Sequence, residues 1–137
     1  MRIATWNVNS VRQRISHLLA YLKEVGPDAL CLQEIKCLDE QFPRMEVEEL
    51  GYNIAIHGQK GFNGVAILAK RPFETKPGLP GDPNDEQARY IEAVVYGKSR
   101  PVRVASSVAK YLSCVACEES SKTTMGTAWP LRQKFSS

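Results

Sequence analysis

The chain lacks any long apolar run. No hydrophobic stretch reaches the about 20 consecutive residues of a membrane-spanning helix, and the first predicted strand begins at residue 2, which leaves no room for a signal peptide. These absences predict a soluble protein with no membrane partner, for which the cytoplasm is the simplest location. In that compartment the four cysteines would stay reduced.

Charge of one sign and histidine are also scarce. The net charge is +3, and the 137 residues include two histidines. A mildly basic chain of this kind permits a polyanionic partner without the clustered charge typical of a dedicated nucleic-acid-binding domain. Cys114 and Cys117 form a Cys-x-x-Cys pair, but no second pair follows. A zinc site needs about four ligands and is therefore not predicted.

Two kinds of periodicity divide the first hundred residues into elements. Apolar residues at three- and four-residue steps predict a helix that begins at Asn9 or Ser10, with Gln13 in capping-box spacing, and ends at Gly26-Pro27. Strands are expected at residues 2–8, 29–34, 52–57, 64–69, 89–96 and 101–106, with a short helix at 43–50 and a proline-rich connection at 72–87. A βαβ unit followed by antiparallel strands predicts a layered α/β fold.

The first two strands each end in a polar side chain. Asn7 closes the first strand and Glu34 the second. Because the crossover of a βαβ unit is right-handed and makes its strands parallel, the two residues should meet at the carboxyl edge of one sheet, where ligands collect. An amide oxygen beside a carboxylate suits a hard cation such as Mg²⁺. Taken singly, each residue would more often be a cap, a turn residue or a solvated acid.

The composition changes after Ser106. Residues 107–137 contain nine Ser or Thr, whereas the much longer segment 1–106 contains six. The hydrophobic periodicity also fades, as is typical of an irregular tail. We therefore expect a domain portion at 1–106 and a divergent, irregular tail at 107–137.

Five sequence blocks stand in a fixed order and spacing. They are Thr5-Trp6-Asn7-Val8-Asn9-Ser10-Val11-Arg12, Pro27-Asp28-Ala29-Leu30-Cys31-Leu32-Gln33-Glu34-Ile35-Lys36, Leu50-Gly51-Tyr52-Asn53, Gly58-Gln59-Lys60-Gly61-Phe62-Asn63-Gly64-Val65-Ala66-Ile67-Leu68, and Gly78-Leu79-Pro80-Gly81-Asp82 followed by Glu86-Gln87-Ala88-Arg89. Together they resemble the N-terminal part of the exonuclease III, or AP endonuclease, family within the endonuclease/exonuclease/phosphatase superfamily. The likeness covers about residues 1–106 and ends where the family continues into a tyrosine-proline loop.

The resemblance implies a fold and an oligomeric state. The chain would form the N-terminal half of a four-layer α/β sandwich, with the second half-sheet missing. The intact family implies a monomer. For this chain an uncovered apolar sheet face would bring a risk of aggregation.

The resemblance also implies a chemistry and a substrate. The family hydrolyses DNA phosphodiesters with Mg²⁺ (Mn²⁺ is the alternative), acting on double-stranded DNA at abasic sites and 3′ ends. On matching positions, Asn7 and Glu34 would be the catalytic and metal-binding residues. The positions that resemble contacts to the DNA backbone are Arg12, Lys36, Gly61, Phe62 and Arg89.

Two alternatives stay open beside the nuclease interpretation. The chain could be a non-catalytic fragment that at most binds DNA weakly, or a relative that hydrolyses small phosphoesters. The family's later Asp-x-Asn pair, which helps to activate water, has no matching counterpart. Asp82-Pro83-Asn84 spells that pattern, but it lies in the proline-rich connection. Neither His17 nor His57 matches the family's catalytic histidine.

Overall fold

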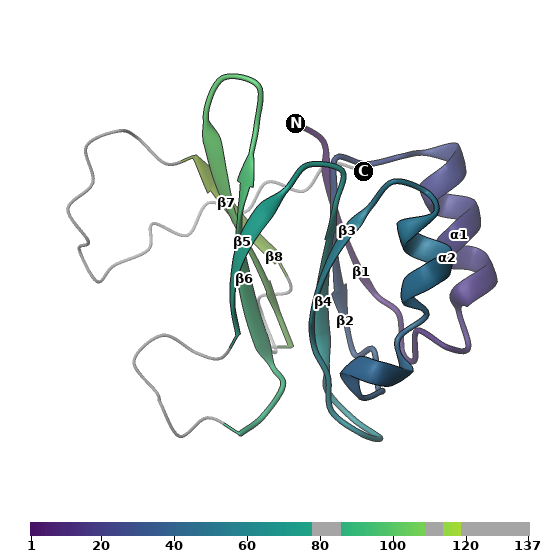
Figure 1. Cartoon of the computed structure of the whole chain (residues 1–137). Helices are drawn as coiled ribbons and strands as arrows, with labels where there is room; N and C mark the ends of the chain where they lie inside the picture. Colours follow the sequence, from purple (N-terminus) through teal and green to yellow (C-terminus); the bar gives the residue numbers. More distant parts are fainter. Residues whose placement is uncertain (78–85, 109–113, 119–137) are drawn as a thin grey trace.

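The computed structural model describes residues 1–77, 86–108 and 114–118 (Figure 1). The segment Asp82-Pro83-Asn84 lies outside these residues. The elements in chain order are β1 (Ile3–Asn7), α1 (Ile15–Glu24), β2 (Ala29–Gln33), the short helical turn η1 (Asp39–Gln41), α2 (Arg44–Glu48), β3 (Asn53–His57), β4 (Val65–Ala69), β5 (Phe73–Pro77), β6 (Tyr90–Tyr96), β7 (Pro101–Ser107) and β8 (Cys114–Glu118).

The first sheet has the strand order β1-β2-β4-β3. β1 and β2 are parallel, as the βαβ pattern predicts, and the other pairs are antiparallel. Both helices lie on one face of this sheet (Figure 1). There Leu18 and Leu22 of α1 join Leu30 and Leu32 of β2 in one buried cluster. Since burying a leucine is worth about 1.5–3 kcal/mol, this cluster fixes the helix layer on the sheet.

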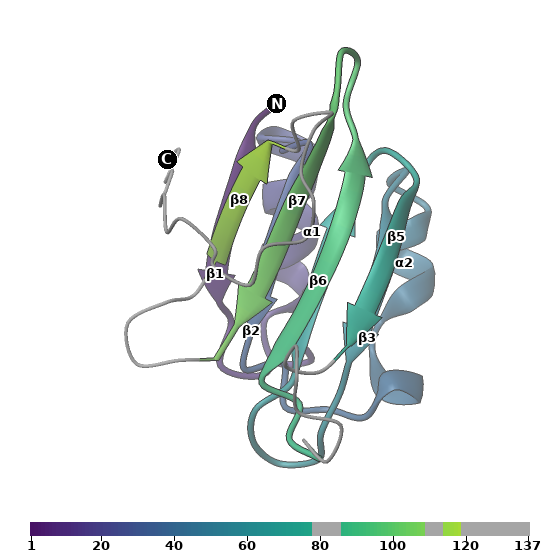
Figure 2. The same ribbon diagram turned by 90° about the vertical axis from the view of Figure 1, so that its left-hand side faces the viewer.

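A second sheet, β5-β6-β7-β8, covers the opposite face of the first (Figure 2). Cys31 and Ile67 of the first sheet share a buried cluster with Ile91, Ala93 and Val104 of the second. The α/β layered architecture is thus confirmed. The expectation of an uncovered apolar face on the first sheet is wrong, because a second sheet packs against that face. Its residues come from the chain after residue 72, where alternating apolar positions supply the covering face.

Two local predictions also differ from the structure. The first helix begins at Ile15 rather than at Asn9 or Ser10, and no side chain caps it. The reason is that Ser10 N and Val11 N donate to Glu34 O (2.8 Å) and Ile35 O (3.1 Å), so this segment follows β2 instead of coiling. Strand β5 lies within the stretch that was predicted to be a connection.

The expected irregular tail contains one described strand. β8 pairs antiparallel with β7, from Val102 opposite Glu118 to Ser106 opposite Cys114. Pairing occupies the backbone groups along β7 that would otherwise form an open sheet edge. Residues 109–113 and 119–137 of the predicted tail lie outside the described residues. Within the described ranges, neither helix is long and apolar enough to span a membrane.

We predict that Tyr52→Phe destabilises the fold in a pH-dependent way. The buried Tyr52 hydroxyl donates to Pro27 O (2.8 Å), so its loss should lower the free energy of unfolding by about 1 kcal/mol at neutral pH. Burial, with a smaller contribution from Asp28, raises the pKa of Tyr52 from 10.0 to about 12. Tyr52 therefore keeps its proton in the folded state at a pH where the unfolded chain releases it.

The contribution of the Tyr52 hydroxyl to stability is complete below about pH 10 and is lost as the pH rises toward about pH 12. Urea unfolding of both proteins across this range should show the wild type losing stability faster than Tyr52→Phe. A stability difference that stays constant with pH would contradict the prediction.

Candidate active site at the carboxyl ends of β1 and β2

One end of the first sheet gathers the residues that the sequence singled out. The last rung of the sheet runs Asn7, Gln33, Val65, His57 across β1, β2, β4 and β3. Glu34 follows Gln33 directly. Asn7 and Glu34 therefore stand at the same end of adjoining strands. His57 is three strands from Asn7, which at the usual strand spacing is about 14 Å.

Backbone strain is concentrated at this end. The five non-glycine residues with positive φ in the described ranges all lie in its loops: Asn9 (42°), Ser10 (83°), Glu34 (54°), Lys36 (53°) and Asn63 (55°). Each left-handed residue costs roughly 1–2 kcal/mol, and such residues persist only where the surroundings fix them. Strain of this kind clusters at functional sites, so it marks this end as the candidate site.

Hydrogen bonds hold the strained loops together. Ile35 N donates to Gly64 O and Lys36 N to Asn63 O, both at 3.1 Å. These bonds tie residues 34–36, the β2 extension, to the β3–β4 loop. Asn7 Oδ1 accepts from Asn9 N (3.2 Å), and Lys36 Nζ donates to Asn9 Oδ1. The side chains that follow β1 and β2 are thus linked directly to one another.

The β3–β4 loop also joins the second sheet to the site. Gln59 Oε1 accepts from Asn63 Nδ2 (3.2 Å) and from Ala88 N (3.1 Å), while Gly64 N donates to Ala88 O (2.8 Å). These contacts bring the segment just before β6 beside the loop. The loop glycines were predicted to supply positive φ, and Gly61 (80°) and Gly64 (87°) do so.

The five predicted DNA-contact residues lie in the loops at this end, but on different segments. Arg12 and Arg89 are exposed, and Lys36 is half-buried. Phe62, at the tip of the β3–β4 loop beside Gly61, leaves 59% of its surface exposed. An aromatic ring so exposed contributes little to the core, which leaves it available to a ligand.

The donor set fits a divalent ion only in part. Asn7 and Glu34 offer an amide and a carboxylate oxygen, the ligand types that Mg²⁺ takes, and Mg²⁺ commonly keeps several waters and binds substrate phosphate. Among the described residues, however, no group of three or more His, Cys, Asp or Glu side chains converges. The arrangement suits a weak, open site that substrate oxygens complete.

Burial and charge act on one thiol next to the site. Cys37 is fully buried, and burial raises the pKa of its thiol above the usual value, while the nearby Arg12 opposes this shift. The thiol is therefore neutral at pH 7 and a poor nucleophile.

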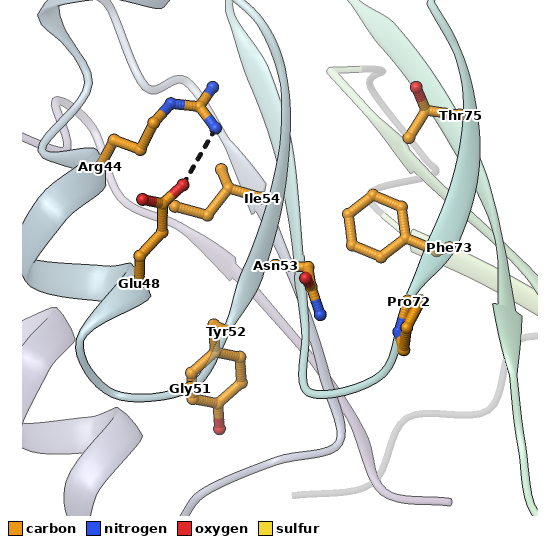
Figure 3. Close-up of a pocket in the computed structure, with 9 residues that line it drawn as sticks. All are labelled: Arg44, Glu48, Gly51, Tyr52, Asn53, Ile54, Pro72, Phe73 and Thr75. Atoms are coloured by element: carbon orange, nitrogen blue, oxygen red, sulfur yellow. Dashed lines mark hydrogen bonds and ion pairs between the residues drawn. The ribbon is translucent and has the colours of Figure 1, made fainter.

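A separate groove lies at the other end of the sheets and is not this site. It measures about 650 Å³ and is lined by residues around α2, the start of β3 and the start of β5 (Figure 3). Its charged pair, Arg44 with Glu48 (3.4 Å), is an exposed i,i+4 ion pair, a type worth about 0.3–0.5 kcal/mol. Asn53, which lines this groove, begins β3 opposite Ala69. It therefore lies at the end of the first sheet that is opposite to Asn7.

Comparison with known proteins identifies the family. A profile of the Endonuclease/Exonuclease/phosphatase family matches residues 4–131. The chain belongs to this family. The match extends past residue 106, where the sequence resemblance was expected to stop. The resemblance to the exonuclease III branch is confirmed by exodeoxyribonuclease III of Haemophilus influenzae, which is 44% identical over 94 residues.

The matches cover only part of the relatives. The alignment with the Haemophilus protein includes 68% of this chain and 35% of that protein. A 3′ phosphatase, NExo, from Neisseria bound to a product DNA hairpin superposes with a TM-score of 0.72 at 39% identity, over 78% of this chain and 40% of that one. An AP endonuclease from Archaeoglobus fulgidus superposes with a TM-score of 0.66 at 42% identity, over 71% of this chain and 38% of that one. The chain therefore spans about a third of the curated relative's length.

Sequence reasoning missed the polar residues behind the site. The sequence pattern places Gln33 in a strand without a role and Ser106 at a change of composition, yet both residues are buried, at 2% and 0% exposure. The available signal was a polar residue at the end of an otherwise apolar strand. A buried amide has to find hydrogen-bond partners.

We predict that Gly64→Ala is more destabilising than Gly61→Ala. Both residues have positive φ, which costs alanine roughly 1–2 kcal/mol. At Gly64 a Cβ would also lie 2.5 Å from Ile35 Cγ1, whereas at Gly61 nothing lies within 4 Å. Overpacking adds about 1–3 kcal/mol. In urea unfolding, the free energy of unfolding of Gly64→Ala should therefore be lower than that of Gly61→Ala by at least about 1 kcal/mol. Equal losses would show that Gly64 does not press on the β2 extension.

Proposed function

We propose that this chain carries the metal side of an exonuclease III-type DNA-repair site, which hydrolyses phosphodiesters of double-stranded DNA at abasic sites and 3′ ends. The observation that supports this most is the common position of Asn7 and Glu34 at the ends of the paired strands β1 and β2. Family membership and the DNA-bound Neisseria neighbour support a DNA substrate.

The roles follow from the two side chains. Glu34 would contribute the carboxylate that holds Mg²⁺ or Mn²⁺, and Asn7 an amide oxygen that binds the ion or orients its other ligands. When bound, such an ion neutralises phosphate charge and stabilises the leaving 3′ oxygen. The hydrogen bond from Asn9 N and the pairing of the strands keep the Asn7 amide oriented before substrate arrives.

The DNA contacts are proposed for the surrounding loops. Arg12, Lys36 and Arg89 would bind backbone phosphates, and the Gly61-Phe62 tip would follow a groove. Three cations and an exposed ring on loops at one end suit recognition of duplex shape rather than base sequence. Because phosphate contacts release counterions, binding should weaken as salt rises.

Turnover by this chain alone should be slow. Catalytic groups that act as a unit lose far more than additive amounts when some are removed, and this chain spans 35% of its Haemophilus relative. The described residues provide one carboxylate and one amide for the ion. We therefore propose the activity for the site and expect it to be detectable only at high enzyme concentration.

We predict that Glu34→Ala abolishes Mg²⁺-dependent incision of a duplex that contains an abasic site. Loss of a group that stabilises the transition state commonly lowers the rate by about 100-fold or more. The matched control is Glu24→Ala, which removes an exposed glutamate at the end of α1. Incision is measured on a labelled duplex, with and without Mg²⁺, for all three proteins.

The alternatives give different results in the same assays. Equal background incision by wild type and Glu34→Ala, with DNA still bound, would indicate a non-catalytic DNA-binding fragment. Hydrolysis of small phosphoesters that depends on Glu34, without incision, would indicate a phosphatase. Either outcome contradicts the nuclease proposal.

A further inference from the structure

Gln33 lies at the junction of both sheets, directly before Glu34. It ends β2, pairs with Asn7 in the last rung of the first sheet, and is only 2% exposed. Along β2 the side chains alternate, and Ala29 and Cys31 belong to the cluster between the sheets. Gln33 shares their parity and therefore points into the same layer. The polar amide of Gln33 therefore lies in the otherwise apolar layer between the two sheets.

Hydrogen bonds connect this amide to two other strands. Gln33 Nε2 donates to Thr5 Oγ1 of β1 and to Ser106 Oγ of β7, both at 3.0 Å. Ser106 Oγ donates in turn to Leu32 O of β2 at 3.0 Å. Both amide protons are used, and no buried side-chain nitrogen or oxygen in the described residues lacks a partner. The network fixes β1, β2 and β7 relative to one another at the site.

Backbone hydrogen bonds also hold the chain around Glu34. Val8 N donates to Gln33 O (3.0 Å) and Ser10 N to Glu34 O (2.8 Å), so the backbone on either side of the carboxylate is bonded to the chain after Asn7. Glu34 itself has positive φ (54°), a conformation that its surroundings must enforce. Gln33, the residue directly before Glu34, is buried and is held by the hydrogen bonds of its side chain.

From this geometry we infer that Gln33 is a positioning residue: its buried amide, held by Thr5 and Ser106, sets the spacing and orientation of Asn7 and Glu34 toward a divalent ion. The inference rests on the proposed metal site. Gln33 touches neither ion nor substrate and acts through its neighbours. Groups that orient metal ligands in this way typically change metal affinity by about 10–100-fold when they are removed.

The test is the affinity of the full chain for Mn²⁺, measured by titration calorimetry. Gln33→Met keeps the length of the side chain and removes its hydrogen bonds. It should weaken Mn²⁺ binding about 10-fold or more. Tyr52→Phe is the control, because it also removes a buried hydrogen bond, near Pro27 at the other end of the sheet. It should leave the affinity within about twofold of wild type, well below the loss expected for an orienting residue.

The outcomes separate the two proposals. Equal Mn²⁺ affinity of wild type and Glu34→Ala would overturn the metal site, and the positioning role with it. Loss with Glu34→Ala but not with a folded Gln33→Met, or equal losses in Gln33→Met and Tyr52→Phe, would overturn the positioning role alone. If Gln33→Met does not fold, Thr5→Val decides: it removes one partner of the amide and should weaken Mn²⁺ binding, and unchanged affinity would overturn the inference.

Discussion

The parallel pairing of β1 with β2 is the constraint on which the rest of the structure depends. Its register sets Asn7 opposite Gln33, and so places Asn7 and Glu34, which end β1 and follow β2, at one end of one sheet. Parallel strands require a crossover, and α1 supplies it with Leu18 and Leu22 buried against the sheet. The hydrophobic packing of α1 on one face of the sheet thus determines which polar residues meet at the carboxyl ends of β1 and β2.

The second sheet does more than cover the first. Its apolar face buries Cys31 and Ile67, while Ser106 at the end of β7 reaches the Gln33 amide. The segment before β6 binds the β3–β4 loop through Ala88. A rigid double sheet therefore carries loops whose backbone is strained, an arrangement in which packing stabilises the strain. Functional side chains sit on loops, and the strands behind them fix their positions.

Sequence reasoning succeeded where a local pattern was sufficient. The βαβ unit, the parallel pair and the strand-end positions of Asn7 and Glu34 follow from apolar periodicity and the handedness of crossovers. It failed where partners distant in sequence decide the structure. Ser10 had the spacing of a helix cap, but its backbone binds Glu34 O, and the helix begins at Ile15 instead.

The strands of the second sheet show the same limit. The β5 strand, Phe73–Pro77, contains two charged residues and ends in proline, so no local signal separates it from a connection. It becomes a strand because the edge of β6 is open to it. The polar contacts of Gln33 were likewise invisible, since Thr5 and Ser106 lie 28 and 73 residues away in sequence.

The most direct test of the account is a map of Mn²⁺ binding on the backbone amides by paramagnetic line broadening in NMR spectra. Substoichiometric Mn²⁺ should broaden the resonances of Asn7, Asn9, Glu34 and Lys36 first. Those of Asp28 and Lys70, which are hydrogen-bonded to each other at the opposite end of the first sheet, should stay sharp. Broadening that begins elsewhere, or that is uniform over the chain, would contradict the claim that the ends of β1 and β2 form one ion site.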